Sequence, residues 1–533
     1  MTTDSGHPRL RRRRRWALWL ALVAILLVIP VRRALRLAAN PSGPKDCPPL
    51  EPDGRRDSPS RPIASQPAVH WQQKGGTVND ASCLNRTSVH GVVAVRTEDD
   101  IRLALAHARA TGLKVSTAGV RHSMGGHAFA IGALMLDMRP FKRITLNDAS
   151  RSVTVQSGAT WHDIQLAIHP RFAVKAMQST DIFTVGGSIS VNAHGMDHRA
   201  GSVGRSIRSM RVMLPDGSVR VVTRDRDPRL FRLVVGGYGL FGIILDVELD
   251  ITDNVVYQSE RRVLDYRQFP DLLTKEIVPN DRYGLLYGHL STSPDSLLAE
   301  MFLYTYRRVE GTPAIPPLGE VSQVKLRRLI FNVGKLGSFW MRLKWFAEKH
   351  LEPLVETCTV SRNEALGQAE GCFVSRNEPM HDSVAYLQND LPEETDILHE
   401  YFIPRTSFVR FVDGLRHIVR EEDANLLNAS VRVVHREDVA LTYAPVDDML
   451  AVVLYLNQTT DGEGRRRMER LTQRLIDLSA ETGGRFFLPY QLAYSPAQLH
   501  RAYPEAKAFF DAKREIDPGE ILTSTFYEKY GRT

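Results

Sequence analysis

The sequence has 533 residues, of which 43% are hydrophobic and 24% charged, a balance typical of a globular protein with two or more domains. The formal net charge of +8 comes from the first 40 residues, where nine arginines face one aspartate. The rest of the chain is neutral as a whole, which argues against a nucleic-acid-binding protein, because such proteins carry a basic patch.

An apolar run at residues 16–31 lies between Arg11–Arg15 and a second group of arginines. This pattern predicts one N-terminal hydrophobic helix that anchors the chain in a membrane, or the core of a cleaved signal peptide. Arginines directly after the run favour the anchor, and the larger cluster before it is expected to stay in the cytoplasm. We therefore expect residues 1–40 to be a basic N-terminus and membrane anchor, with a single pass and an extracytoplasmic body.

Residues 41–85 are predicted to be a tether, because their first part is rich in proline, serine and aspartate. The chain has four cysteines, which allow three pairings that spacing alone does not decide. An extracytoplasmic body would permit disulfides. No cysteine belongs to a CxxC pair, so no metal site is expected. The cysteines are Cys47, Cys83, Cys358 and Cys372.

Regular structure is expected from Val89 onward. Thr97 and Asp100 form a capping box at the start of a helix that Gly112 ends. Alternation of apolar and acidic residues predicts a half-buried strand at 245–251. The mixed order of helices and strands predicts an α+β fold. Further strands are expected at 92–95, 114–117, 134–138, 152–156, 210–214 and 219–222, with a short helix at 161–168.

Residues 256–480 form a second region of strands and helices, including a strand at 449–456 and a helix at 465–482. The segment 325–352 is basic and amphipathic. It would lie on a membrane surface or, as is more common, pack on its own domain. Residues 481–533 complete the chain with a helical tail.

Three glycine-rich segments occupy residues 117–127, 179–195 and 236–244. Glycine permits unusual backbone angles and close approach, so backbone N–H groups in such loops can surround phosphate oxygens. Neither the GxGxxG nor the GxxxxGK[ST] pattern fits. Each segment alone is a weak signal, but together they indicate a large flat ligand laid against the backbone.

In this order and spacing the three segments resemble the PCMH-type FAD-binding domain of the vanillyl-alcohol-oxidase superfamily. Within that superfamily the chain is most similar to aldonolactone and alditol oxidases and to decaprenylphosphoryl-ribose oxidase. The resemblance is strongest over 89–251 and returns at 483–488 and in the C-terminal tail. It implies a two-subdomain FAD-binding domain at 86–255, an α+β substrate (cap) domain with an antiparallel sheet at 256–480, and a segment at 481–533 that returns to the FAD site.

The resemblance also implies which residues bind FAD. His122 stands where alditol and gulonolactone oxidases carry a histidine covalently bound to the flavin, whereas the ribose oxidase lacks it, so covalent and non-covalent FAD remain open. The implied cofactor-binding residues are Thr117, Ala118, Gly119, Val120, Arg121, His122, Ser123, Met124, Gly125, Gly126, Ser179, Thr184, Val185, Gly186, Gly187, Val191, Asn192, Ala193, His194, Ile243 and Phe487.

The implied catalytic residues are His194, Arg432 and Tyr490. The resemblance implies the reaction class but not the substrate, because Met196 and Tyr490 stand where the ribose oxidase has lysines. Ser430 likewise replaces the acid of the alditol oxidases' Glu-Ile-Arg triplet. A turn formed by His435, Glu437 and Asp438 is expected to be solvated.

The implied reaction is the oxidation of an alcohol by hydride transfer to flavin N5. The expected substrate is a polyol, sugar, lactone or lipid-linked sugar, and the expected electron acceptor is oxygen or a quinone-type carrier. A base must take the hydroxyl proton, and its identity stays open. The alternatives are a dehydrogenase that uses a quinone or another carrier, and a non-catalytic flavin-binding membrane protein.

Overall fold

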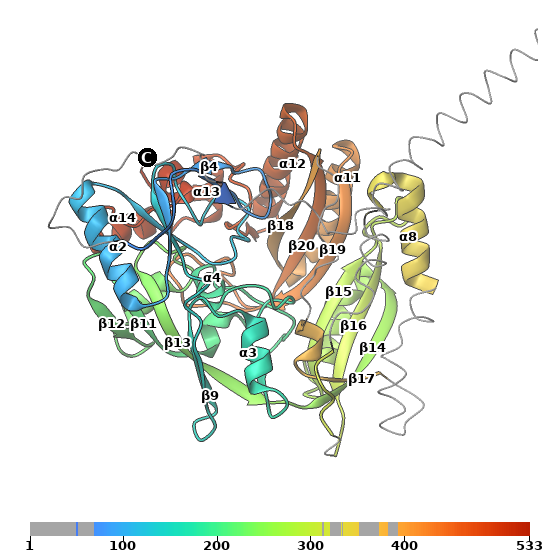
Figure 1. Ribbon diagram of the computed structural model, residues 1–533. Coiled ribbons are helices and arrows are strands. Elements are labelled where there is room, and N and C mark those ends of the chain that lie inside the picture. Colours follow the sequence, from blue (N-terminus) through green and yellow to red (C-terminus); the bar gives the residue numbers. More distant parts are fainter. Residues whose placement is uncertain are drawn as a thin grey trace, which may run out of the picture.

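The computed structural model describes residues 50–51, 69–311, 314–319, 332, 334–350, 372–381 and 393–532 (Figure 1). The expected hydrophobic helix at 16–31 lies outside these residues. Among the described helices, none is long and apolar enough to cross a membrane. The mixed helix and sheet architecture confirms the α+β prediction.

The first sheet carries the beginning of the predicted FAD-binding domain. Strands β5, β7 and β6 are parallel, and β2 pairs with β5 antiparallel. Helix α2 (Glu98–Thr111) packs on it and has the predicted capping box of Thr97 and Asp100, and Gly112 ends the helix at φ 70°. The strand order is β2 (Trp71–Lys74), β5 (Gly91–Ala94), β7 (Leu134–Asp137) and β6 (Val115–Ala118). A smaller sheet has β1 (Leu50–Glu51), β3 (Thr77–Val78) and β4 (Thr87–Ser88).

The second sheet is antiparallel throughout. Its longest strand, β13, alternates buried apolar with half-buried acidic residues as predicted. Its strands are β12 (Val219–Val222), β11 (Ile207–Met213), β13 (Ile243–Asp253), β9 (Ser152–Gln156) and β8 (Ile144–Asn147), with β10 (Phe172–Val174) on β13. The helices in this region are α3 (Trp161–Ile168), α4 (Val185–Ser190) and α5 (Pro228–Val234).

The third sheet has eight strands and confirms the antiparallel sheet expected in the cap region. One face packs against α6 (Phe269–Leu272), α11 (Phe408–Glu421) and α12 (Gly462–Glu481), where Leu415 and Leu475 share a core with Leu454. The strand order is β17 (Cys372–Ser375), β14 (Val256–Asp265), β16 (Glu300–Arg308), β15 (Tyr283–Leu290), β19 (Asn425–Val434), β20 (Met449–Thr459), β18 (Glu394–Pro404) and β21 (Arg485–Phe486).

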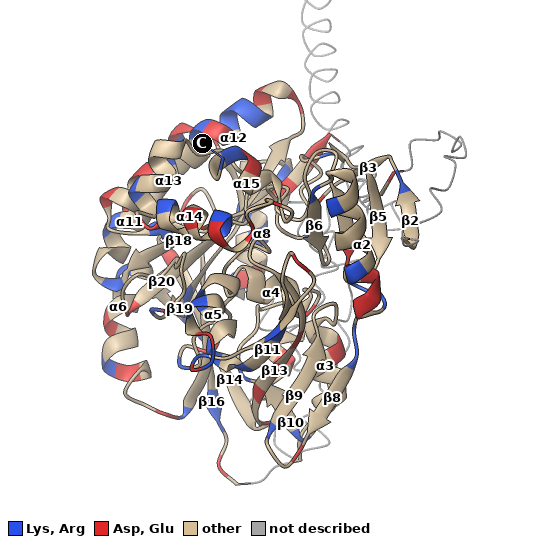
Figure 2. Cartoon of the chain, turned by 90° about the vertical axis from the view of Figure 1, so that its left-hand side faces the viewer, with Lys and Arg blue, Asp and Glu red and all other residues tan. Residues whose placement is uncertain are grey.

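Helix α8 (Ser338–His350) lies in the predicted basic amphipathic segment. Trp345 is buried and stacks on Phe302 of β16 with ring centroids 4.2 Å apart, so the helix packs on its own domain. Its other side exposes Phe339, Leu343 and Phe346. Elsewhere, the view of Figure 2 shows basic and acidic residues interspersed on α12 and α14, in keeping with the neutral body.

The C-terminal segment pairs with the first sheet. Val115 donates its backbone N–H to Ile521 at 2.7 Å, and Thr523 donates to Val115 at 2.9 Å. At its other end, β21 pairs with β18 of the large sheet. The segment therefore joins the two sheets that flank the candidate site. Its helices are α13 (Pro496–Ala502), α14 (Ala506–Ile516) and α15 (Thr525–Tyr530).

The predicted tether at 41–85 extends too far along the chain. Residues 69–85 contain β2 and β3, Asp80 is buried, and Cys83 is disulfide-bonded. The polar composition predicted a flexible tether. The structure instead shows that Asp80 and Asn85 form hydrogen bonds with the first glycine-rich segment.

Candidate active site

The second and third glycine-rich segments lie against each other. The backbone N–H of Gly236 donates to the carbonyl of Ile189 at 2.9 Å, and that of Tyr238 donates to Ser190 at 2.8 Å. Gly236 and Tyr238 adopt φ 71° and 53°, in the left-handed region. Glycine occupies this region without strain, whereas Tyr238 adopts it at a cost that the surrounding contacts must offset.

The first and second segments approach so closely that a side chain would not fit between them. A Cβ at Gly119 would lie 1.9 Å from Thr184 Oγ1, well inside van der Waals contact. A Cβ at Gly186 would similarly lie 2.7 Å from the Cβ of Ser157. The close approach of Gly119 to Thr184 and the hydrogen bonds from Gly236 and Tyr238 therefore place the three segments side by side.

The first segment is held by residues that the sequence interpretation missed. Asp80 accepts the backbone N–H of Gly126 at 3.0 Å, and Asn85 donates to the carbonyl of Met124 at 2.7 Å. Burial raises the pKa of Asp80 to about 6, against the lowering effect of its hydrogen bonds, including the one from Ser82. The local pattern Asn-Asp-x-Ser is typical of a turn closed by its own side chains and offered a signal for this anchor.

Buried polar atoms without partners test whether these segments fit FAD. Arg121 is buried at φ 56°, and within the described chain its Nε and Nη1 have no hydrogen-bond partner. Burial lowers the pKa of this guanidinium. Ser157 Oγ and Asn192 Nδ2 are likewise buried without partners there. Unpaired buried groups are costly, and a guanidinium matches phosphate geometry, so these residues fit a phosphate-bearing ligand.

A second group of side chains lies between the glycine-rich segments and the large sheet. His194 Nε2 and Glu400 Oε1 are 2.5 Å apart, and both side chains are 4% exposed. The Tyr490 hydroxyl donates to Glu400 Oε2 at 3.3 Å. Burial and the neighbouring Glu400 raise the pKa of Tyr490 well above its usual value, so the hydroxyl stays protonated. His194 Nδ1 has no hydrogen-bond partner in the part of the chain that the structure describes.

Strand register explains how Arg432 reaches the same site. Glu400 of β18 and Ser430 of β19 are both paired with Val453 of β20, so the three side chains share one face of the sheet. Arg432 follows Ser430 by two residues and lies on that face too. Burial lowers the pKa of Arg432, while its electrostatic interactions with Glu400 and Tyr490 oppose that change. The structure thus brings together the three predicted catalytic residues.

Glu400 is the central residue of this group, and the sequence interpretation missed it. It is the one acid within the apolar stretch Ile397–Ile403 of β18. A carboxylate in the middle of a buried strand is rare unless it is paired, and that signal pointed to a functional residue.

Aromatic side chains surround the His194–Glu400 pair. Phe402 and Tyr443 stack with centroids 4.2 Å apart, and His194 lies edge-on to Phe402 at 5.6 Å. Phe487, predicted to contact FAD, lies 6.5 Å from His194. These rings lower the local polarity, which strengthens the electrostatic interactions of the pair.

Two other predicted FAD contacts occupy contrasting positions. His122 is half-buried with its ring 4.9 Å from that of Phe183, and burial lowers its pKa to about 4. A neutral imidazole at this position is compatible with both open alternatives for the flavin. The Ile243 side chain packs in the core of the first sheet with Met213 and Leu245, which leaves its backbone for the implied contact.

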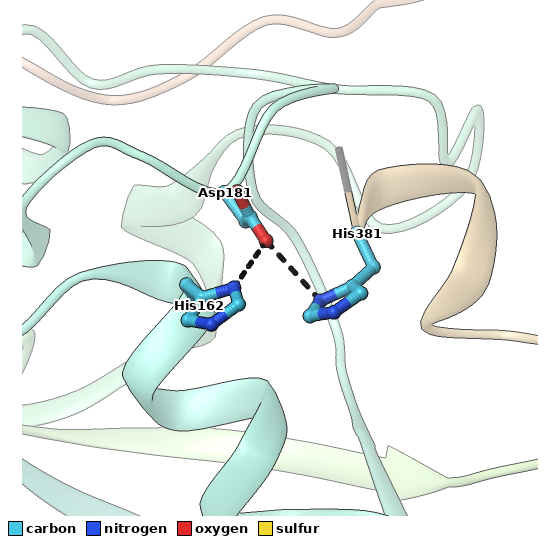
Figure 3. Close-up of side chains that lie close together, drawn as sticks. All are labelled: His162, Asp181 and His381. Carbon is cyan, nitrogen blue, oxygen red and sulfur yellow. Dashed lines mark hydrogen bonds and ion pairs between the residues drawn. The ribbon is translucent and has the colours of Figure 1, made fainter. Parts of the chain in front are cut away.

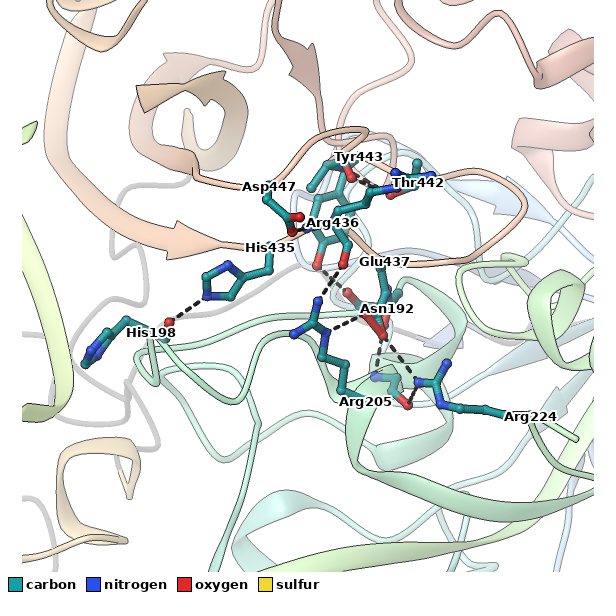
Figure 4. A network of polar contacts seen from close by, with 12 residues as sticks. Asn192, His198, Arg205, Arg224, His435, Arg436, Glu437, Thr442, Tyr443 and Asp447 are labelled. Atoms are coloured by element: carbon teal, nitrogen blue, oxygen red, sulfur yellow. Dashed lines mark hydrogen bonds and ion pairs between the residues drawn. The ribbon is translucent and has the colours of Figure 1, made fainter. Parts of the chain in front are cut away.

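We predicted a solvated turn at His435, Glu437 and Asp438. This prediction is wrong for Glu437, which is buried (Figure 4). Arg205 Nε donates to its carboxylate at 3.0 Å and Arg224 lies 3.4 Å from it. Asp438 is exposed, as expected, and His435 is half-buried. The prediction failed because Arg205, in the short helix Val203–Ser206, and Arg224, in the loop after β12, lie 232 and 213 positions before Glu437 in the sequence.

This network also holds the loop that carries His194. The Tyr443 hydroxyl donates to the carbonyl of Asn192 at 2.9 Å, and Gly204 donates to the Asn192 side chain at 3.0 Å (Figure 4). Asn192 adopts φ 49°, a conformation that this residue tolerates better than most. The loop is therefore fixed from both domains.

Comparison with known proteins agrees with this geometry. A family described as FAD binding domain matches residues 89–223. Decaprenylphosphoryl-beta-D-ribose oxidase of Mycolicibacterium smegmatis is 35% identical over 195 residues, 36% of this chain and 40% of that protein. Cytokinin dehydrogenase 2 of Arabidopsis thaliana is 29% identical over 478 residues, 83% of this chain and 91% of that protein. L-gulonolactone oxidase 3 of the same plant is 28% identical over 249 residues, which are 44% of this chain and 42% of that protein.

The match confirms FAD as the cofactor and confirms the resemblance on which the site residues were assigned. The chain spans about two fifths of the length of the ribose oxidase. The similarity therefore bears on the cofactor-binding part more directly than on the substrate.

Proposed function

Because residues 89–223 belong to the FAD-binding domain family of the vanillyl-alcohol-oxidase superfamily, we propose that the whole chain is an FAD-dependent oxidoreductase that oxidises an alcohol. The observation that carries the proposal is the buried His194–Glu400 pair beside the glycine-rich segments. The proposed substrate is a polyol, sugar, lactone or lipid-linked sugar. The names of the ribose oxidase and the gulonolactone oxidase support this class.

When bound, FAD would supply the hydride acceptor of the reaction. The loops around Arg121 and Thr184 would hold the phosphate-bearing part of FAD. The rings of Phe487 and Tyr443 lie beside His194, one of the proposed reacting groups. The chain's own residues then have three tasks: to orient the alcohol, to exclude water and to take the hydroxyl proton.

His194 is the proposed base. An ionised Glu400 can only accept a hydrogen bond, so the contact of 2.5 Å places the imidazole proton on Nε2. The Nδ1 atom then carries a lone pair, and it is the nitrogen without a partner in the described residues. After Nδ1 takes the hydroxyl proton, Glu400 stabilises the imidazolium, as a carboxylate does for the histidine of a catalytic triad.

Tyr490 and Arg432 support this pair in different ways. Tyr490 keeps its proton and donates to Glu400, which fixes the carboxylate. Arg432 contributes a half-buried positive charge, which favours negative charge that develops in the reaction. We propose that Tyr490 and Arg432 affect the rate of alcohol oxidation more than the affinity for FAD.

The test is anaerobic mixing of the flavin-loaded full chain with a panel of polyols, sugars and lactones. Loss of the visible flavin absorbance with one class would support the proposal. Adding oxygen or a soluble quinone afterwards would then distinguish an oxidase from a dehydrogenase. If no alcohol reduces the flavin, including a lipid-linked sugar, the non-catalytic alternative replaces the proposal.

The linkage of FAD to His122 is tested separately. After acid precipitation of the flavin-loaded chain, yellow flavin is expected in the pellet, because the half-buried neutral imidazole stands at the position that is covalently bound in alditol oxidases. His122→Ala should release the flavin into the supernatant. Flavin released by the unchanged chain would exclude a covalent bond and favour the arrangement of the ribose oxidase.

We also propose the domain limits 86–255, 256–480 and 481–533, with the first two sheets as the two subdomains of the FAD-binding domain. Residues 16–31 are proposed to anchor the chain in a membrane with the body outside the cytoplasm. The flanking arginines and the apolar stripe of Phe339, Leu343 and Phe346 support a membrane-proximal body. Protease accessibility of the body in intact cells would test the orientation, and full protection would contradict it.

A further inference from the structure

Three side chains that the proposed reaction does not use converge next to the second glycine-rich segment (Figure 3). His162 lies at the start of α3, Asp181 lies in the segment itself, and His381 follows the short helix Glu378–Met380. Asp181 Oδ2 is 2.8 Å from His162 Nδ1 and 3.1 Å from His381 Nδ1. Both imidazoles therefore point the same type of nitrogen at one carboxylate oxygen.

The Asp181 carboxylate is buried and only partly hydrogen-bonded. Its side chain is 2% exposed, and its Oδ1 has no hydrogen-bond partner among the described residues. Its Oδ2 contacts one nitrogen of each imidazole. A buried carboxylate of this kind is stable when a cation is close to it.

We propose that His162, Asp181 and His381 form a binding site for a divalent transition-metal cation of the zinc class. The three ligand atoms lie within 4.8 Å of one another. Two imidazoles and one carboxylate are a donor set that Zn²⁺ prefers. In a tetrahedral zinc site neighbouring ligand atoms are about 3.3 Å apart. The two Nδ1 atoms would therefore move a few tenths of an ångström away from Asp181 Oδ2, and their own separation, which is within 4.8 Å, would reach the same spacing.

Neighbouring groups can complete and support the site. Gln165 Oε1 lies 2.9 Å from His381 Nδ1 and can serve as a fourth ligand. Its amide donates to the carbonyl of Asn377 at 3.1 Å, which fixes the oxygen toward the cluster. His162 is 36% exposed and provides a path for the cation to enter. Binding requires each imidazole to carry its proton on Nε2, so that both Nδ1 lone pairs face the cation.

The site would act as a clamp between distant parts of the chain. His162 and Asp181 belong to the FAD-binding part, whereas His381 follows β17 of the large sheet. The clamp holds the loop that leads into Thr184, which contacts the first glycine-rich segment at Gly119. Removing the cation should therefore loosen the loop without changing the reacting groups around His194.

The experiment uses the flavin-loaded full chain, dialysed against a chelator and then loaded with Zn²⁺. Metal content after removal of excess ion should be one Zn²⁺ per chain, and the melting temperature should rise on loading. Co²⁺ in place of Zn²⁺ should give the visible absorption bands of a tetrahedral site. None of these measurements depends on a substrate.

His162→Ala and His381→Ala should each abolish the bound Zn²⁺ and the rise in melting temperature. His417→Ala is the matched control, because His417 is exposed and lies 3.0 Å from a single carboxylate, that of Glu421. It should keep both properties. Zn²⁺ that remains on the two cluster variants would place the cation elsewhere, and a chelated wild-type chain that takes up no Zn²⁺ would overturn the proposal.

Discussion

Glu400→Gln is expected to reduce the rate at which an alcohol bleaches the bound flavin by about 10²- to 10⁴-fold, with the FAD content unchanged. The carboxylate of Glu400 only accepts hydrogen bonds, and its contact with His194 Nε2 leaves the lone pair on Nδ1. A glutamine amide can donate to Nε2 instead. The imidazole would then carry its proton on Nδ1, where it cannot act as a base, and the imidazolium would lose its counter-charge.

Stopped-flow measurement of flavin reduction by an alcohol gives the rate, and the FAD content of the purified variant shows whether the cofactor site is intact. Glu400→Asp keeps the charge and should restore part of the rate.

Asp396→Asn is a suitable control, since Asp396 is a buried acid of the same strand that pairs with Lys335 and not with His194. It should lower stability and leave the rate of flavin reduction in the folded protein nearly unchanged. If Glu400→Gln reduces the flavin as fast as the unchanged chain does, His194 is not oriented by Glu400 and the proposed base is wrong.

Arg121→Ala is expected to weaken FAD binding by about 3 kcal/mol, or roughly a hundredfold, because two charge-assisted hydrogen bonds to phosphate would be lost. The guanidinium is buried, and two of its nitrogens have no hydrogen-bond partner in the part of the chain that is described. Arg121→Lys should recover only part of the loss, since an ammonium keeps the charge without the two-pronged geometry.

Fluorescence titration of the apoprotein with FAD measures the affinity. The titration is best done in chains that also carry His122→Ala, so that no covalent bond can form. Arg102→Ala provides the control, because Arg102 is half-exposed on α2 and pairs with Glu98 and Asp99. Equal affinities for the Arg121 and Arg102 variants would show that Arg121 does not contact the cofactor.

Much of the FAD-binding region could be predicted from the sequence because its signals are local. The capping box of Thr97 and Asp100 and the final Gly112 define α2 through hydrogen bonds within a few residues. The strand at 152–156 and the helix at 161–168 have the bounds that their apolar patterns predicted. The glycine-rich segments were recognisable because a backbone that must approach a ligand closely needs glycine at particular positions.

The residues that the prediction missed depend on contacts between distant parts of the chain. Glu400 meets His194 across 206 positions, and Glu437 meets Arg205 across 232. Asp80 was assigned to a tether because its hydrogen bonds go to a loop that comes 46 positions later. The sequence does not show whether a polar side chain forms its hydrogen bonds with water or with a buried partner.

The sequence by itself therefore determined many of the elements, through periodicity, caps and glycine positions that act over a few residues, and it indicated the cofactor through a resemblance to a known family. Only the tertiary structure decided which charged groups share a buried site. The large sheet had to pack against the second glycine-rich segment before Glu400 could orient His194, or before His381 could reach Asp181. Burial in a low-dielectric surrounding makes such pairs strong, and that surrounding exists only after the chain has folded.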